Sequence, residues 1–350
     1  MIQPRKHLLQ VERDVQCFYS RDGISRLDMN EYLPYASSCL YEELIQRLQP
    51  EIFSSYPMVN EAYRAVSRLI NQPEDKIVLT EGSDGVIYST LMAFCNSGDE
   101  IGYVEPTYGM YAVYAALMNL RVNSFQYDLY HPLDRDKILD SIRPEMKVFL
   151  LANPNGVIGD ELEYDFILQL VEKGNKTGTI ILIDEVYAAF QDNGNSRFTA
   201  LTERYNNLVI ARSFSKSYGL AGIRAGYSIS HVDTRKILLT VRSNVELNSI
   251  AVEAIKIWCN HPQELQSSIK EIVEAKKMIC GELKKNNNLF IEGKGNFILV
   301  KVEEEKQWKE KFSHENIAVK WLELEGQKWI RVTVGTFSYM QRFLDVILKR

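Results

Sequence analysis

Short apolar runs that alternate with longer amphipathic segments constrain the fold of this 350-residue chain more than any other feature. Five compact, partly β-branched runs lie close to Gly, Pro or Asn turns, which is typical of buried strands. They are "KIVLT" (76–80), "IGYV" (101–104), "VFLLA" (148–152), "IILID" (180–184) and "LVIAR" (208–212). Helix-like segments such as "VIYSTLMAF" and "YDFILQLVEK" separate several of them. Strand–helix alternation predicts an α/β domain with a mostly parallel sheet, whose ligands bind beyond the carboxyl ends of the strands.

The last third of the chain has a different pattern. Apolar residues recur at helical spacing over 262–286, and two short strand-like runs, "NFILVKV" and "WIRVTV", and a terminal helix follow. This order predicts a smaller α+β domain. We therefore expect an N-terminal segment (1–40) that packs on the small domain or on a partner subunit, a large domain (41–245) and a small domain (246–350).

Composition excludes several classes of protein. The net charge of −5 argues against a nucleic-acid binder. Apolar runs such as "TIILI" (179–183) are too short to span a membrane, and the first residues have no apolar core of a secretory signal. The five cysteines are odd in number and show no CxxC spacing, so we expect reduced thiols, no metal site and a cytoplasmic protein.

The stretch "SFSKSYGLAGIRAGY" (213–227) places Lys216 on a small, hydroxyl-rich turn with Ser213 and Ser215, and Arg224 follows. Most lysines are solvated surface charges, so Lys216 alone carries little weight. A second segment, "TEGSDG" (80–85), lies between a strand and a helix, where backbone N–H groups bind anions. An anion cradle beside a nucleophilic amine indicates a phosphorylated aldehyde held as a Schiff base, and pyridoxal phosphate is the candidate.

That cofactor needs further partners, and candidates follow the predicted strands. Asp184 could pair with the ring nitrogen, Asn153 and Tyr187 with the ring oxygen, and Tyr108 could cover the ring. Each has a structural alternative: a strand-end cap for Asp184, a Pro-Asn-Gly turn around Asn153, and core or loop aromatics for the tyrosines. All four residues follow the ends of predicted strands, in order along the chain, and this arrangement favours the cofactor site.

These motifs resemble the fold-type I, aspartate-aminotransferase-like family of pyridoxal-phosphate enzymes. "SFSKSYGLAGIRAGY", "ANPNG", "IDEVYAAF", "PTYGMY" and "WIRVTVGT" most resemble its histidinol-phosphate aminotransferase branch, from about residue 25 onward. The resemblance implies that Lys216 binds the cofactor and moves the proton, with Asp184 and Tyr108 as its catalytic neighbours. It also implies a phosphate site formed by Ser83, Asp84, Ser213, Ser215 and Arg224.

The resemblance also implies an anionic substrate and a homodimer. Arg331, Lys320 and Asn30 correspond to substrate-binding positions, and Tyr56 to a tyrosine that reaches the phosphate of the other subunit. Several positions depart from the branch. The N-terminal motif is "NEYLPYAS" (30–37). Ser55 and Phe337 each replace an arginine, and Lys320 replaces a third arginine. The stretch "RSNVELNS" (242–249) replaces a Pro-Tyr-Asn pattern. Histidinol phosphate itself is therefore not the predicted substrate.

We expect an aminotransferase that moves an amino group between an amino acid such as glutamate and a keto acceptor. The acceptor could carry a phosphate. A decarboxylase of a phosphorylated amino acid is the alternative within the same family, because it uses the same cofactor contacts. A regulatory protein that keeps the fold without turnover is less favoured, since Lys216, Asp184 and Arg331 are all present. For Arg331 a salt bridge to Glu323 or Glu325 is the structural alternative.

Overall fold

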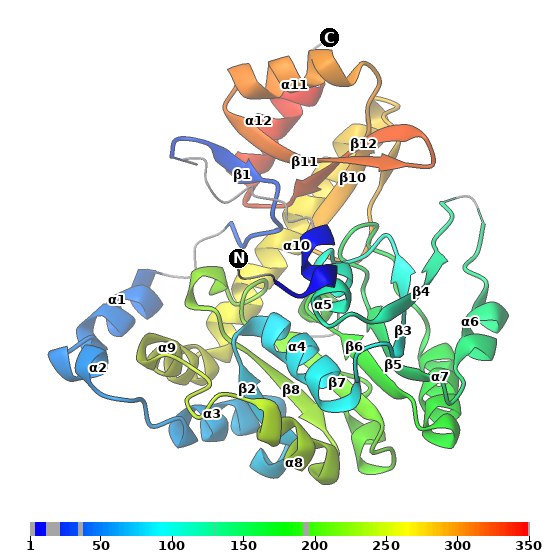
Figure 1. Ribbon diagram of the computed structural model, residues 1–350. Helices are drawn as coiled ribbons and strands as arrows, with labels where there is room; N and C mark the ends of the chain where they lie inside the picture. The colour runs from blue at the N-terminus through cyan, green and yellow to red at the C-terminus, as the bar shows by residue number, and fades with distance from the viewer. Residues whose placement is uncertain (1–3, 12–21, 34–37, 130, 192–195, 349–350) are drawn as a thin grey trace.

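The computed structural model describes residues 4–11, 22–33, 38–129, 131–191 and 196–348. Cys17 and residues 34–37 of the "NEYLPYAS" motif lie outside this part of the chain. Two sheets form the centres of a large and a small lobe, and the long helix α10 (Pro262–Lys285) runs from one to the other (Figure 1). The chain is α/β and of the fold type that the sequence predicts.

The large sheet has seven strands in the order β2-β8-β7-β6-β5-β3-β4. β8 runs antiparallel to both of its neighbours, β2 and β7, and the other strands run in one direction, so the sheet is mostly parallel, as predicted. The strands are β2 (Ile77–Thr80), β3 (Glu100–Glu105), β4 (Arg121–Gln126), β5 (Met146–Ala152), β6 (Ile180–Asp184), β7 (Leu208–Ser213) and β8 (Gly226–Ser230). The apolar runs do not identify β4, whose burial pattern is mostly exposed, or β8, which begins inside the lysine motif.

Both faces of this sheet are buried. Alternate residues of its strands point to opposite faces, and each face packs in a core cluster of its own. Leu150 and Leu182 pack in the core cluster on one face, whereas Phe149 and Ile181 pack in the cluster on the other. Helices on the two faces provide the cover that a parallel sheet requires. They are α3 (Asn60–Ile70), α4 (Gly82–Phe94), α5 (Met110–Leu117), α6 (Arg135–Ser141), α7 (Tyr164–Thr177), α8 (Val232–Val241) and α9 (Ser249–Asn260).

The small lobe contains a five-stranded sheet in the order β1-β11-β12-β10-β9, with a separate core. Its strand β1 comes from the N-terminal segment and pairs in parallel with β11, through Arg26 and Ala318 among others. The elements are β1 (Ser25–Leu27), β9 (Phe290–Ile291), β10 (Phe297–Lys301), β11 (Ile317–Leu324), β12 (Gln327–Thr333), α11 (Glu305–His314) and α12 (Phe337–Ile347).

The packing of helix α9 affects where the boundary between the two domains is placed. Its buried residues, such as Ile255 and Trp258, belong to the core cluster of the large sheet. The pair α1 (Ser38–Arg47) and α2 (Pro50–Ser54) lies beside α9 at the outer edge of the large lobe (Figure 1). The division into 1–40, 41–245 and 246–350 remains a prediction, and this packing favours a boundary nearer to His261.

No helix in the described ranges is both long enough and apolar enough to cross a membrane. Within the same ranges, no three His, Cys, Asp or Glu side chains are grouped so that they could hold a metal ion.

Candidate active site

The carboxyl ends of the parallel strands bring most of the predicted residues to one edge of the large sheet. Asp184 is the last residue of β6, and Ser213 is the last residue of β7. Tyr108 follows β3, and the first turn of α4 follows β2. Residues more than a hundred positions apart therefore meet where ligands of such sheets bind.

Asp184 is a buried carboxylate with a fixed orientation. Its Oδ1 accepts a hydrogen bond from the backbone N–H of Val186 at 3.2 Å, and its Oδ2 accepts one from the Tyr111 hydroxyl at 3.2 Å. Burial raises the pKa of Asp184 from 3.8 to about 7, although both hydrogen bonds oppose the shift. A buried carboxylate with such a pKa is well suited to a partner that brings a proton or a positive charge.

Lys216 lies on the turn after β7, and its side chain reaches the N-terminal segment. Its Nζ donates to the carbonyl of Met29 at 2.8 Å and lies 5.9 Å from the centre of the Tyr187 ring. The start of the turn is held by Ser213, whose Oγ accepts from the backbone N–H of Ser215 at 3.0 Å. The serines thus shape the turn that presents the amine.

The predicted anion cradle is formed by α4 and Arg224. The first turn of a helix has backbone N–H groups without intrahelical partners, and Ser83 and Asp84 belong to this turn of α4. Arg224 has a φ of +57°, and its Nη2 lies 3.1 Å from Oδ2 of Asp84. The Tyr108 hydroxyl donates to the other oxygen of Asp84 at 2.8 Å, which links the ring to the cradle.

Glycines make this cradle possible. Gly82 has a φ of +71°, and a Cβ there would lie 3.1 Å from Nη2 of Arg224. A Cβ on Gly226 would lie 2.4 Å from the carbonyl carbon of Gly82. A side chain at Gly82 would fill the space beside the cation, and one at Gly226 would push away the backbone that begins α4, so the glycines present fit a bound phosphate.

Tyr187, Asn30 and Arg331 lie close together between the small lobe and this edge of the large sheet. Asn30 donates from Nδ2 to the Tyr187 hydroxyl at 3.0 Å. Arg331 donates from Nη1 to the carbonyl of Gly156 at 2.8 Å and from Nη2 to that of Asp28 at 3.1 Å. Its Nε is buried without a hydrogen-bond partner in the described structure, and burial lowers the pKa of the guanidinium.

The alternative salt bridge for Arg331 is not formed in the described structure. Glu323 pairs with Lys328, and Glu325 accepts from the backbone N–H of Leu129 at 3.1 Å. Lys320 instead stands directly opposite Arg331 on the neighbouring strand β11.

Asn153 directly follows β5, at the strand end where the sequence places it. Its Oδ1 accepts from the backbone N–H of Leu162 at 2.8 Å, and its Nδ2 donates to the carbonyl of the same residue at 3.3 Å. Both ends of the amide thus hold the following loop. The part of this loop next to Tyr187 is Gly156, where a Cβ would lie 2.9 Å from Cε2 of the tyrosine. The amide nitrogen of Asn153 carries two hydrogens, of which this loop uses one, so its contact with the ring oxygen of the cofactor stays a prediction.

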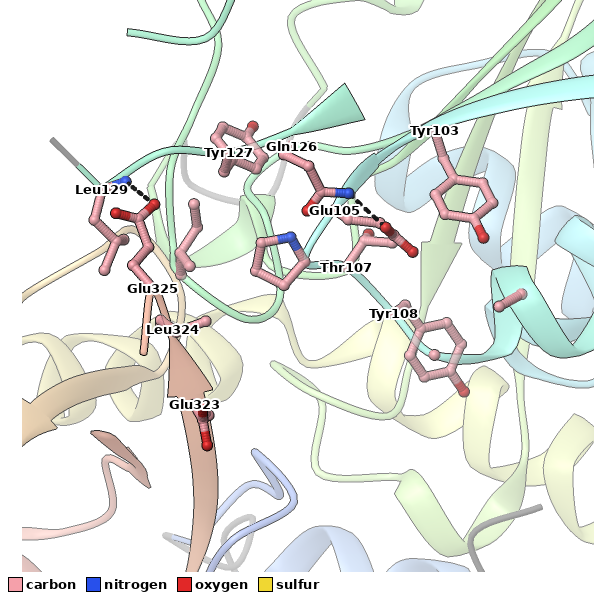
Figure 2. A pocket seen from close by; sticks show the side chains of 14 residues that line it. Tyr103, Glu105, Thr107, Tyr108, Gln126, Tyr127, Leu129, Glu323, Leu324 and Glu325 are labelled. Carbon is pink, nitrogen blue, oxygen red and sulfur yellow. Dashed lines mark hydrogen bonds between the residues drawn. The ribbon is translucent and has the colours of Figure 1, made fainter. Parts of the chain in front are cut away.

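A cavity of about 500 Å³ lies beside Tyr108, between the end of β3 and the β11–β12 turn (Figure 2). Glu105 accepts from Nε2 of Gln126 at 2.7 Å in its wall, and Glu323 and Glu325 line the other side. Every one of these carboxylates has a partner in the chain.

Sequence patterns missed two features of the site. Tyr111 lies inside the "PTYGMY" motif, but nothing in the motif shows that its hydroxyl bonds Asp184. Glu185 and Arg212 form a buried ion pair, 3.0 Å between Oε2 and Nη1, that ties the end of β6 to the end of β7. Two opposite charges at the ends of buried strands were the available signal for this pair.

The fold and this lysine-centred site define the class of protein: an α/β enzyme built to hold a phosphorylated aldehyde. Residues 23–347 match the family model "Aminotransferase class I and II", and the chain belongs to this family. It is a pyridoxal-phosphate-dependent aminotransferase of fold type I.

Similar proteins agree with this assignment. A histidinol-phosphate aminotransferase of Thermoanaerobacter sp. (strain X514) is 31% identical over 291 residues, which cover 79% of this chain and 78% of the relative. The structure of histidinol-phosphate aminotransferase from Sinorhizobium meliloti in complex with pyridoxal-5'-phosphate superposes with a TM-score of 0.86 at 17% identity, covering 99% and 97% of the two chains. L-Threonine-O-3-phosphate decarboxylase from Porphyromonas gingivalis shares the fold, with a TM-score of 0.77, 20% identity and coverage of 93% and 98%.

Proposed function

We propose that this aminotransferase uses an amino-acid donor such as glutamate and a keto acceptor that carries a second anion such as a phosphate. The observation that supports the acceptor is the pair of cations Lys320 and Arg331, directly opposite on β11 and β12. Directly opposite residues project from the same face of a sheet, so one anion could be held by both cations. The buried Nε of Arg331, without a partner in the described residues, adds a donor for such an anion.

The residues at the sheet edge fit the cofactor, which supplies an electron sink when it is bound. We propose that Lys216 binds its aldehyde carbon, that Asp184 faces its ring nitrogen, and that Tyr108 covers its ring. Tyr187, held by Asn30, is the donor for the ring oxygen. The phosphate would be bound by Ser83, Asp84, Ser213, Ser215 and Arg224.

These roles follow from what each side chain can do. Asp184 keeps a proton at the ring nitrogen, since a buried carboxylate favours a positively charged partner. Once the substrate amine has displaced it, the Lys216 amine would take the proton from the substrate Cα and return it at C4′ of the cofactor, two bonds away across the nitrogen. Arg331 holds the substrate carboxylate or phosphate, and this orientation decides which bond at Cα is broken.

Titration with glutamate tests the proposed reaction against the alternative. Amino transfer converts the bound cofactor to its amine form with release of the 2-oxo acid, and a phosphorylated keto acid should reverse the change. A decarboxylase would instead release CO2 from a phosphorylated amino acid and leave glutamate unchanged. A protein that only binds would do neither.

Replacing Arg331 by lysine should raise KM for donor and acceptor alike, by about tenfold to a hundredfold. Lysine keeps the charge but lacks the planar fork that binds a carboxylate through two hydrogen bonds. Steady-state kinetics with glutamate and with several 2-oxo acids measure the effect.

Lys320→Ala provides the matched variant, because Lys320 stands opposite Arg331 on the same sheet. It should weaken only acceptors that carry a phosphate, while plain 2-oxo acids keep their KM. If Lys320→Ala leaves every phosphorylated acceptor unaffected while Arg331→Lys impairs plain 2-oxo acids, the second anion is ruled out and an ordinary amino-acid aminotransferase remains.

We propose that the active unit is a homodimer. Four large apolar side chains are exposed on α1, α2 and the loop that follows: Ile45 (67%), Phe53 (66%), Tyr56 (87%) and Met58 (77%). Apolar surface of this kind commonly marks an interface. Tyr56 makes no contact with the described cradle of its own chain, so the proposal places it at the phosphate of a second copy.

Tyr56→Phe should weaken cofactor binding by about tenfold to a hundredfold, the effect of losing one hydrogen bond to a charged group. Titration with pyridoxal phosphate measures the affinity, and light scattering measures the mass. Tyr164→Phe on α7, at the opposite edge of the large lobe from α2 (Figure 1), serves as the control. A fully active monomer at the assay concentration would contradict the proposal.

A further inference from the structure

The hydroxyl of Tyr111 makes a contact that the packing of its ring does not require. It lies in the first turn of α5, is fully buried, and points its hydroxyl at Oδ2 of Asp184, 73 residues further along the chain. Burial raises the pKa of this hydroxyl well above its usual range, and Asp184 raises it further. The hydroxyl therefore stays protonated and donates to the carboxylate.

We propose that Tyr111 is a positioning residue, whose hydroxyl fixes the orientation of the Asp184 carboxylate and favours its ionised form. The inference rests on the proposed role of Asp184 at the ring nitrogen of the cofactor. With Val186 donating to Oδ1 and Tyr111 to Oδ2, the plane of the carboxylate cannot rotate without breaking one of the two bonds.

The ring of Tyr111 is itself held in place. It meets Tyr103 edge-on, with ring centres 5.9 Å apart, and Tyr108 at 6.1 Å and an interplanar angle of 87°. Its backbone N–H also donates to the carbonyl of Tyr108 at 3.0 Å. The turn that carries the ring-covering tyrosine thus also carries the donor to Asp184, so the two contacts are set by one local structure.

The charge balance around Asp184 makes this donor important. The like charges of Asp84 and Glu185 raise its pKa, and burial raises it most. The groups that face it are Asp84 from α4, Tyr108 from the loop before α5, Tyr111 from α5, and Glu185, which is paired with Arg212 of β7. Among these, the Tyr111 hydroxyl favours the carboxylate by a direct hydrogen bond.

A structural alternative is that the Tyr111 hydroxyl only satisfies its own need for a partner, as buried tyrosines do. In that case Tyr111→Phe would lower stability and leave the protonation of Asp184 unchanged. The test must therefore measure the carboxylate itself.

The experiment is an infrared pH titration of the Asp184 carboxyl in the full-length protein freed of cofactor, with Asp184→Asn to assign the band. In Tyr111→Phe the midpoint should lie about one to two pH units higher than in the wild type, because a hydrogen bond to the charged form is lost. Tyr103→Phe keeps the same ring cluster and should leave the midpoint unchanged. An unchanged midpoint in Tyr111→Phe overturns the proposal.

Two further measurements support or overturn the same assignment. If Tyr111→Phe does not fold, 3-fluorotyrosine at position 111, a stronger donor of the same shape, should lower the midpoint, and no change there overturns the proposal. In the cofactor-loaded enzyme, Tyr111→Phe should lower kcat about tenfold with KM for glutamate within twofold, and a change in KM alone would contradict it. The titration needs no turnover, so a shifted midpoint in a protein that transfers no amino group would contradict the proposed function and not this inference.

Discussion

Lys216→Ala is expected to abolish amino transfer, with a loss of at least about 10,000-fold. The variant loses both the amine that binds the cofactor covalently and the group that moves the proton, and either loss alone is large. The visible absorbance of the bound cofactor should disappear, and steady-state assays with glutamate should give no measurable turnover.

The folded chain should tolerate this change, which makes the result interpretable. The amine of Lys216 donates only to the carbonyl of Met29 among the described groups, so its removal leaves no buried charge without a partner. Thermal unfolding of the cofactor-free variant should match the wild type within a few degrees. Lys236→Ala, on the exposed face of α8, is the control for replacing a lysine. A Lys216→Ala variant with wild-type turnover would end the assignment of the site.

Asp184→Asn is expected to lower kcat by about 100- to 1,000-fold while part of the cofactor binding remains. An amide cannot stabilise a positive charge on the ring nitrogen, although it preserves the shape of the site. Spectroscopic titration measures the binding, and kcat with glutamate measures the loss. Unchanged activity would make Asp184 no more than a cap at the end of β6.

The same variant should be more stable than the wild type when no cofactor is bound. The pKa of Asp184 is about 7 in the folded chain and 3.8 without the fold. Between these values the folded chain holds a proton that the unfolded chain has lost, so stability falls as the pH rises from about 4 to 7. Asparagine does not titrate, and its advantage should be largest above pH 7, on the order of 4 kcal/mol, and shrink toward pH 5.

Thermal unfolding of both cofactor-free proteins at pH 5 and pH 8 checks this. A residue that costs stability in the empty site and is required for the reaction is kept for function. Equal melting temperatures at pH 8 would show that the buried carboxylate carries no such cost.

The order of residues along the chain was enough to predict much of the fold. The runs at 76–80, 148–152 and 180–184 are continuous in apolar and β-branched residues, because their strands are buried on both faces. β4 escaped prediction because it is an edge strand with mostly exposed side chains, and its sequence "RVNSFQ" lacks an apolar run. The predicted division places helix α9 in the small domain; its apolar face packs with the core of the large sheet, and the boundary stays a prediction.

For the site, the order of strands and motifs predicted that Lys216, Asp184, Tyr108 and Arg224 lie at one edge of the large sheet. Each follows a strand of the same parallel sheet or lies on the turns beside it, and strand direction alone brings such positions together. Which atoms meet at that edge depends on how the distant segments pack. The amide of Asn153 bonds the backbone of Leu162, the hydroxyl of Tyr111 bonds Asp184, and Lys320 stands opposite Arg331. Residue order fixes the edge on which a side chain lies, but hydrogen bonds depend on rotamers and on packing between distant segments, which local sequence does not encode.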